Sequence, residues 1–138
     1  MFEHQHLVQF YETDLMGIVH HSNYLKYFEE ARVAWAHQMG IIDYQKPESA
    51  SYFAVVETQV KHLKPALFGD LLKIFVQARI KGVRIYFEYK AYRDAITIAE
   101  ARTEHVSLDK ELKLMKPPQS LREIMEKSVW TETWLSSL

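Results

Sequence analysis

The sequence contains no cysteine among its 138 residues, so disulfide bonds and thiolate chemistry are excluded and the redox compartment stays unconstrained. Glycine and proline are also scarce, with four of each, and they separate periodic segments without forming a low-complexity linker. Neither sign of charge dominates, because 17 basic residues face 18 acidic ones. This balance gives no electrostatic reason to expect nucleic-acid binding. No apolar run reaches the roughly 20 residues of a membrane helix.

What the chain does contain is enough apolar material for one core. Hydrophobic residues make up 48% of the sequence and charged residues 25%, which is typical of a folded globular protein. A length of 138 residues suits one core, so we expect residues 1–138 to form a single domain. The first residues lack a basic segment followed by an apolar stretch, so we expect no signal peptide and a cytoplasmic location.

The spacing of apolar residues predicts one long helix over residues 22–39. Its apolar stripe consists of Tyr24, Leu25, Phe28, Ala31, Trp35 and Met39. Ser22 is a candidate N-cap, and Gly40 is a candidate for the first residue beyond the helix end. A helix of this length would span roughly 27 Å, which is long for so small a domain.

Most of the remaining periodic segments alternate with a period of two, which predicts strands. The predicted strands cover residues 4–11, 53–63, 71–81, 83–92, 96–108 and 112–115. Residues 41–51 are typical of a loop, and residues 119–134 of a C-terminal helix. One long helix beside about five antiparallel strands predicts an α+β fold in which a curved sheet wraps the helix. The aromatic residues expected on the other face of the sheet, which suggest association of copies, are Phe75, Tyr86 and Tyr92.

The run from Tyr11 to Tyr24 brings a carboxylate, a glycine and two histidines next to the predicted helix start. Asp14 can act as a base or as a nucleophile. Backbone N–H groups at the start of a helix carry partial positive charge and can stabilise a carbonyl oxygen that becomes negative. These are the parts needed to attack an acyl carbonyl. The alternatives are that Asp14 caps a turn and that Gly17 simply forms that turn.

The histidines raise the question of a metal site, but their spacing argues against one. His20 and His21 are adjacent, and on extended backbone adjacent side chains point to opposite sides, so both would not reach one ion with Asp14. His4 and His6 share a predicted strand face but lack a third ligand. We therefore expect no metal.

Two motifs carry a family resemblance: YxxDxxGxVxHxNY over residues 11–24 and YFEEAR over residues 27–32. They resemble the hotdog-fold acyl-CoA thioesterases of the 4-hydroxybenzoyl-CoA thioesterase type, and are most similar to the YbgC-like branch. Weaker matches follow at residues 55–57, 62–66, 69–70 and 87–89. The resemblance covers about residues 5–116 and implies a single hotdog domain, with one central helix wrapped by the sheet.

The resemblance also implies an activity, the hydrolysis of acyl-CoA to a carboxylic acid and free CoA. No cofactor is needed, since CoA is part of the substrate. The expected catalytic residues are Asp14, Gly17 and His21. Asp14 matches the catalytic carboxylate, and Gly17 would allow close approach of the backbone to the ligand. The backbone N–H of His21 would polarise the thioester carbonyl, and its side chain would assist. Further residues expected to contact substrate are Ile18, Val19, His20, Asn23, Tyr24, Glu57, Lys61, Lys64 and Arg84. The family forms homodimers, often paired into homotetramers, with active sites at the dimer interface.

Two other functions stay open from the sequence. A hotdog hydratase or dehydratase would need an Asp and His pair for proton transfer along the acyl chain, and the spacing of Asp14 and His21 does not resemble that arrangement. A non-catalytic module that binds acyl-CoA or an acyl carrier protein would keep the pocket without needing Asp14. An acyl carrier protein is therefore an alternative partner to CoA. Neither nucleic acid nor a membrane is an expected partner.

Overall fold

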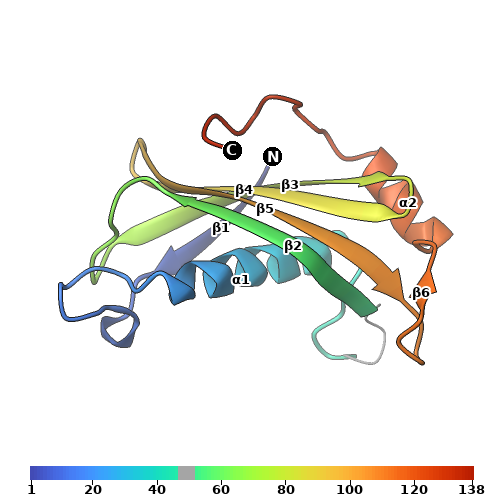
Figure 1. Ribbon diagram of the computed structural model, residues 1–138, viewed down its shortest axis with the longest axis horizontal. Helices are drawn as coiled ribbons and strands as arrows, with labels where there is room; N and C mark the ends of the chain where they lie inside the picture. Colours follow the sequence, from blue (N-terminus) through green and yellow to red (C-terminus); the bar gives the residue numbers. More distant parts are fainter. Residues whose placement is uncertain (47–51) are drawn as a thin grey trace.

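The structure is a computed structural model that describes residues 1–46 and 52–138 (Figure 1). The strands are β1 (Phe2–Leu7), β2 (Tyr52–His62), β3 (Leu71–Lys81), β4 (Arg84–Arg93), β5 (Ile96–Leu108) and the short β6 (Leu114–Met115). The helices are α1 (Ser22–Gln38) and α2 (Gln119–Glu126), and one 3₁₀ turn, η1 (Phe10–Glu12), precedes α1. The α+β prediction is therefore confirmed, with α1 lying along one side of the sheet.

Among residues 1–46 and 52–138 the sheet has six strands, in the order β1-β3-β4-β5-β2 with β6 beside β5, and each pairing between them is antiparallel. Residues directly opposite each other share a face. The register puts Phe87 opposite Thr103 on one face, and Glu88 opposite Arg102 on the other. Phe87 meets Trp35 of α1 edge-on, with ring centroids 5.2 Å apart. The face of Phe87 is therefore the inner face, toward α1, and the face of Glu88 is the outer face.

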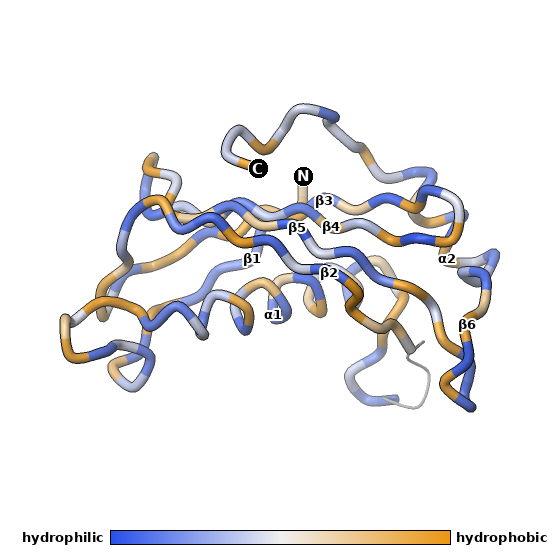
Figure 2. Tube along the Cα trace, viewed as in Figure 1, coloured by the Kyte–Doolittle hydropathy of each residue, from blue (hydrophilic) through white to orange (hydrophobic). Residues whose placement is uncertain are grey.

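The helix α1 buries most of the stripe that the sequence predicts. The stripe residues Tyr24, Phe28, Ala31 and Trp35 are buried. Leu25 is 51% exposed, so its place in the buried stripe was predicted wrongly. The Phe28 ring lies 5.0 Å from that of Tyr89. Burying one side chain of this size contributes about 1.5–3 kcal/mol. Apolar and polar residues are interspersed along the strands, as the colours in Figure 2 show. One face of α1 therefore packs on the inner face of the sheet.

Two sequence predictions about the N-terminal half need correction or restriction. The predicted strand over residues 4–11 stops at Leu7, because the chain turns into η1, where the N–H of Glu12 donates to the carbonyl of Gln9 at 3.0 Å. The predicted loop over residues 41–51 is described only as far as residue 46, where a turn is found. Residues 47–51 lie outside the described residues.

The predicted helix over residues 119–134 is correct only at its start, because α2 ends at Glu126. The chain after α2 crosses the outer face of the sheet (Figure 1). The N–H of Thr131 donates to the side-chain oxygen of Gln77 at 2.9 Å, and its carbonyl accepts from the Gln77 amide at 3.0 Å. The N–H of Ser136 donates to Glu100 at 2.8 Å. These backbone groups bind the sheet and so cannot continue the helix.

This C-terminal tail covers part of the face that the sequence offered for association of copies. The guanidinium of Arg79 lies 4.3 Å from the Trp130 ring centroid, and the Lys90 ammonium lies 5.4 Å from that of Trp134. Such cation–π contacts are favourable. No helix in the described ranges is long and apolar enough to cross a membrane.

Candidate active site

The loop between η1 and α1 carries Asp14. Its turn is closed by two backbone hydrogen bonds, from the N–H of Asp14 to Ile18 at 2.8 Å and from the N–H of Gly17 to Asp14 at 3.0 Å. Gly17 has φ of +78°, a conformation that side chains rarely adopt, so the turn requires glycine. The fold of this loop therefore follows from its own sequence.

The carboxylate of Asp14 is only partly used by the turn. Its Oδ1 atom accepts the N–H of Met16 at 2.8 Å. Its Oδ2 atom has no hydrogen-bond partner among the described residues. The turn-capping interpretation is therefore correct for one oxygen, and the other oxygen stays available to a ligand.

The loop is docked on the segment that follows β2. The N–H of Val19 donates to the carbonyl of Ala66 at 2.8 Å. Arg93 supports this segment from β4, because its guanidinium donates to the carbonyl of Pro65 at 2.7 Å and to the carboxylate of Asp70 at 3.2 Å. The loop is thereby fixed relative to the sheet.

The start of α1 supplies an unpaired donor. The helix begins at Ser22, so His21 and not Ser22 occupies the N-cap position, one residue earlier than predicted. The Nδ1 atom of His20 accepts the N–H of Ser22 at 3.2 Å. The backbone N–H of His21 has no acceptor in the part of the chain that the structure describes. An unpaired N–H at the positive end of a helix is suited to an oxygen that gains negative charge.

A pocket of about 400 Å³ joins the loop to the helix start. The residues that line it are Asp14, Met16, Ile18, Val19, His21, Tyr24, His62, Leu63, Lys64 and Pro65. Six of them were predicted as site residues from the sequence, namely Asp14, Ile18, Val19, His21, Tyr24 and Lys64. The structure therefore brings a carboxylate, an imidazole, a helix start and a cation to one pocket.

His62 also lines this pocket, although the sequence did not single it out. Its ring meets that of Tyr24 edge-on at 5.0 Å. Burial and the nearby charge of His21 lower the pKa of His62, which keeps its imidazole neutral and able to accept a proton near pH 7. One available signal was strand alternation, which puts His62 on the same face of β2 as Val60, opposite the buried Ala99.

Three predicted contact residues do not line the pocket, because they lie on the outer face. Lys61 is opposite Glu100 and Glu57 is opposite Glu104, and both glutamates share the face of Arg102. Arg84 belongs to the same face and its guanidinium lies 3.4 Å from Glu104. Within one chain these three side chains therefore do not line this pocket, and their contact with substrate stays a prediction.

Three other predicted residues shape the site without lining the pocket. The side-chain amide of Asn23 donates to the carbonyl of Glu12 at 2.8 Å and so ties α1 to the preceding loop. The His20 ring lies against that of His21 at 4.3 Å, and Gly17 forms the turn described above. These contacts are structural, and a role of the three residues in catalysis or substrate binding stays a prediction.

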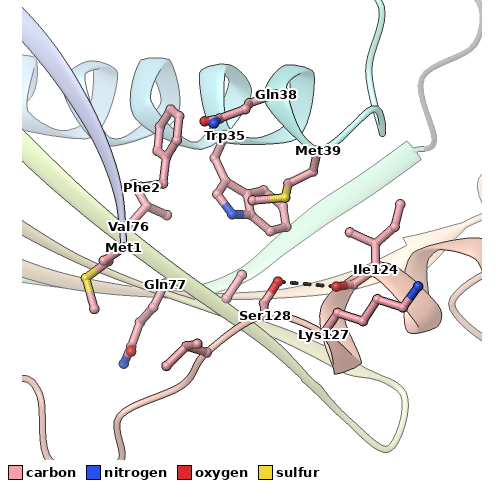
Figure 3. Close-up of a pocket in the computed structure, with 12 residues that line it drawn as sticks. Met1, Phe2, Trp35, Gln38, Met39, Val76, Gln77, Ile124, Lys127 and Ser128 are labelled. Carbon is pink, nitrogen blue, oxygen red and sulfur yellow. Dashed lines mark hydrogen bonds between the residues drawn. The ribbon is translucent and has the colours of Figure 1, made fainter.

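A larger cavity of about 570 Å³ lies near the other end of α1 (Figure 3). It is lined by Met1, Phe2, Trp35, Gln38, Met39, Val76, Gln77, Ala78, Ile124, Lys127, Ser128 and Val129. Among these side chains Lys127 alone is ionisable, so the cavity has no carboxylate or imidazole for acyl chemistry. In residues 1–46 and 52–138, no group of three or more His, Cys, Asp or Glu side chains is arranged to hold a metal ion.

Residues 8–125 match the Thioesterase-like superfamily. The chain belongs to this family. Acyl-CoA thioesterase YbgC of Haemophilus influenzae is 28% identical over 119 residues, covering 85% of this chain and 86% of that protein. A 1,4-dihydroxy-2-naphthoyl-CoA hydrolase of Thermosynechococcus vestitus is 29% identical over 110 residues, covering 77% and 75%.

The fold comparison agrees with the family match. The crystal structure of a hypothetical protein from Aquifex aeolicus superimposes with a TM-score of 0.84 at 28% identity, covering 91% of this chain and 99% of that one. The resemblance to hotdog-fold thioesterases is therefore confirmed, and the thioesterase family member described here is an α+β hotdog protein.

Proposed function

We propose that the chain hydrolyses acyl-CoA thioesters to a carboxylic acid and free CoA in the pocket of Asp14 and His21. One observation carries the proposal: Asp14 and His21 line the same pocket. Oδ2 of Asp14 and the backbone N–H of His21, at the start of α1, both lack a hydrogen-bond partner among the described residues. Membership of the thioesterase family supports thioester hydrolysis. The similarity to an acyl-CoA thioesterase supports CoA as the carrier.

The chemistry needs few groups, because a thioester is already an activated acyl group. The carbonyl oxygen would lie at the His21 N–H and gain negative charge as the carbon becomes tetrahedral. Asp14 would either attack that carbon or take a proton from the attacking water. In both cases the C–S bond then breaks, and the sulfur of CoA leaves as a thiolate that takes a proton. If water attacked, the acid forms directly; if Asp14 attacked, the acyl group is left as an anhydride with Asp14, and water hydrolyses that anhydride to release the acid.

A basic residue at the pocket supports CoA as the group that carries the acyl chain. Lys64 lines the pocket and can pair with a CoA phosphate.

The strand β2 is an edge strand, with Val55 51% and Val56 48% exposed. Exposed apolar side chains on a free edge favour pairing with a second copy. We therefore infer a homodimer through β2, while the tail over the outer face disfavours further association there.

The direct test is thiol release from acetyl-CoA, hexanoyl-CoA and benzoyl-CoA, followed with a thiol reagent. The chain has no cysteine, so the protein itself gives no signal. Asp14→Asn keeps an oxygen for the Met16 N–H but loses the charge, and we expect turnover to fall at least about 100-fold. Asp109→Asn is the matched control, because Oδ1 of Asp109 likewise accepts an N–H two residues later, from Glu111 at 2.8 Å, in a turn that does not line the pocket. It should keep wild-type turnover. Wild-type turnover in folded Asp14→Asn would remove Asp14 from the mechanism.

The role of Asp14 can be assigned by a single turnover in heavy-oxygen water. Heavy oxygen in the Asp14 carboxylate would show that an anhydride had formed and that Asp14 is the nucleophile. Heavy oxygen in the product acid alone would favour direct attack by water, with Asp14 as the base.

A further inference from the structure

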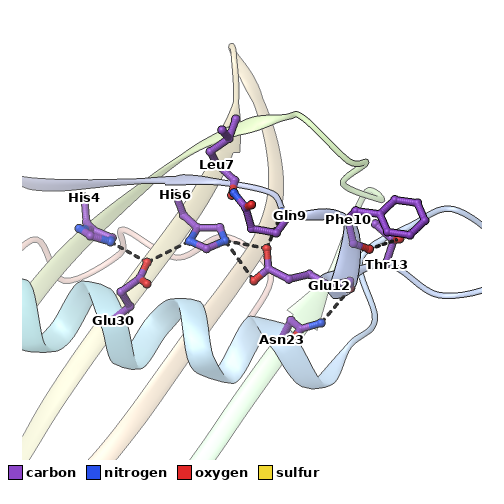
Figure 4. Close-up of polar contacts among 9 residues, drawn as sticks. All are labelled: His4, His6, Leu7, Gln9, Phe10, Glu12, Thr13, Asn23 and Glu30. Carbon is purple, nitrogen blue, oxygen red and sulfur yellow. Dashed lines mark hydrogen bonds and ion pairs between the residues drawn. The ribbon is translucent and has the colours of Figure 1, made fainter.

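The carboxylate of Glu12 lies outside the pocket and has no step in the proposed reaction, yet only 6% of the residue is exposed. It accepts the N–H of Gln9 at 2.7 Å and contacts Nε2 of His6 at 2.9 Å (Figure 4). Burial alone would raise the pKa of the Glu12 carboxyl, but these hydrogen bonds and the charge of His6 outweigh burial and lower it. Glu12 is therefore ionised at neutral pH and tied to β1.

The main chain of Glu12 holds the two ends of the loop that carries Asp14. Its carbonyl accepts the N–H of His20 at 2.9 Å and the side-chain amide of Asn23 at 2.8 Å. Asp14 follows Glu12 by two residues, and His21 follows His20 directly. The placement of Glu12 therefore sets the separation between the Asp14 carboxylate and the His21 N–H.

We propose that Glu12, held by His6, is a positioning residue for the thioesterase reaction. This inference rests on the proposed function, because it affects the rate only if Asp14 and His21 act on one thioester. Without the carboxylate, η1 loses its tie to β1 and the two reacting groups spread over a wider range of separations. A misplacement of about 1 Å in such groups can cost on the order of 100-fold in rate.

His6 has a second carboxylate on the other side of its ring, and this residue provides a matched control. Nδ1 of His6 lies 3.1 Å from Oε2 of Glu30, and Nε2 of His4 lies 2.8 Å from the same oxygen (Figure 4). Glu30 projects from α1 with 47% of its side chain exposed. Within the described ranges its hydrogen-bond partners are His4 and His6, so it shares the imidazole with Glu12 without touching the loop.

The test compares kcat and KM of Glu12→Ala, Glu12→Gln and Glu30→Ala on whichever of the three thioesters the wild type hydrolyses fastest. We expect Glu12→Ala to lower kcat about 10- to 100-fold with little change in KM, because ground-state binding is kept. Glu12→Gln should recover most of the loss, since its amide oxygen can still accept the N–H of Gln9. Glu30→Ala should keep wild-type kcat. Each variant is assayed well below its melting temperature.

Amide hydrogen exchange gives a second readout that does not depend on activity. The informative group is the N–H of His20, because its acceptor, the Glu12 carbonyl, survives the substitution. We expect faster exchange there in Glu12→Ala and wild-type exchange in Glu30→Ala.

The two proposals fail in distinguishable ways. A wild type that hydrolyses no thioester overturns the proposed function, and exchange at His20 then decides whether Glu12 holds the loop. Wild-type kcat in Glu12→Ala overturns the positioning role. An equal loss of kcat in Glu30→Ala, or unchanged exchange at His20 in Glu12→Ala, overturns it as well.

Discussion

The two ends of α1 differ in how completely their backbone groups are paired. At the C-terminal end, the N–H of Met39 donates to Trp35 at 3.0 Å and the N–H of Ile41 donates to Ala36 at 2.8 Å, so carbonyls of the last turn are satisfied. At the N-terminal end, the N–H of His21 has no acceptor among the described residues. A helix end usually finds partners for such groups. The N-terminal end, with its unpaired N–H, is the end at which we propose that the substrate binds.

The cavities beside the two ends differ in the same way. The pocket at the N-terminal end is lined by Asp14, His21, His62 and Lys64, which bring charge and proton acceptors. The cavity at the C-terminal end is formed largely by apolar side chains around the buried Trp35. The N-terminal end of α1 thus lies beside ionisable side chains, and its C-terminal end beside mainly apolar ones. We call them the chemical end and the packing end. Substitutions at the chemical end should mainly change turnover, and substitutions at the packing end should mainly change stability.

The largest expected effect on stability is at the packing end. Trp35→Ala removes a buried ring that meets Phe87, and we expect the free energy of unfolding to fall by about 3–5 kcal/mol. Urea denaturation measures this loss. Leu25→Ala, at a helix position that is 51% exposed, should cost at most about 0.5 kcal/mol. If Trp35→Ala molecules that are still folded lost turnover, the packing end would also affect catalysis, and the two ends could not be assigned separate roles.

The sequence predicted the packing end of α1 better than the chemical end. The stripe through Phe28 and Trp35 follows from spacing alone, because burial repeats with the helical period. The pocket depends on which face of β2 each side chain occupies, and a shift of one residue reverses that face. His62, which lines the pocket, was missed for this reason. The adjacent Lys61 points to the other face of β2, and its contact with substrate stays a prediction.

The conformation of the C-terminal tail could not be predicted from the local spacing of apolar residues. The residues after Glu126 have apolar spacing compatible with a helix, but the tail binds Gln77 and Glu100, which are far away in the sequence. Local propensity is a weak guide where such tertiary contacts decide the conformation.

Two glycines allow the two ends to be compared with the same substitution. Gly17 and Gly40 both have φ of +78°, and at both an added Cβ would meet no atom within 4 Å. Alanine at either position should cost about 1–2 kcal/mol of stability, because this conformation is strained for any side chain. Gly17→Ala should in addition lower kcat about tenfold, because it shifts the turn that holds Asp14.

Thermal unfolding measures the stability of Gly17→Ala and Gly40→Ala, and steady-state kinetics measure their kcat. Gly40→Ala should keep wild-type kcat, since its turn contacts no pocket residue by hydrogen bond in the described chain. Equal kcat in the two variants would mean that the Gly17 turn does not position the reacting carboxylate.

The smallest expected effect is a shift in the titration of His62. Burial and the charge of His21 lower the pKa of His62, so we expect nuclear magnetic resonance to find it titrating below its ordinary value near 6.5. His21→Asn removes the charge and should raise the pKa of His62, while burial keeps it below that value. His105, on the inner face, has a pKa lowered to about 4 by burial and by Arg32, and it should not change.

The sign of the pH effect on stability follows from these shifts. A lowered pKa in the folded state means that the unfolded chain binds more protons as pH falls below about 6.5, so stability decreases there. The loss of stability due to His62 is largely complete once the pH falls below the pKa of His62 in the folded protein. This loss should be smaller in His21→Asn, because the pKa of His62 is then lowered less. Chemical denaturation between pH 7 and pH 5 measures the difference. An unchanged pKa of His62 in His21→Asn would mean that the charge of His21 does not act on His62 and that burial alone lowers the pKa of His62.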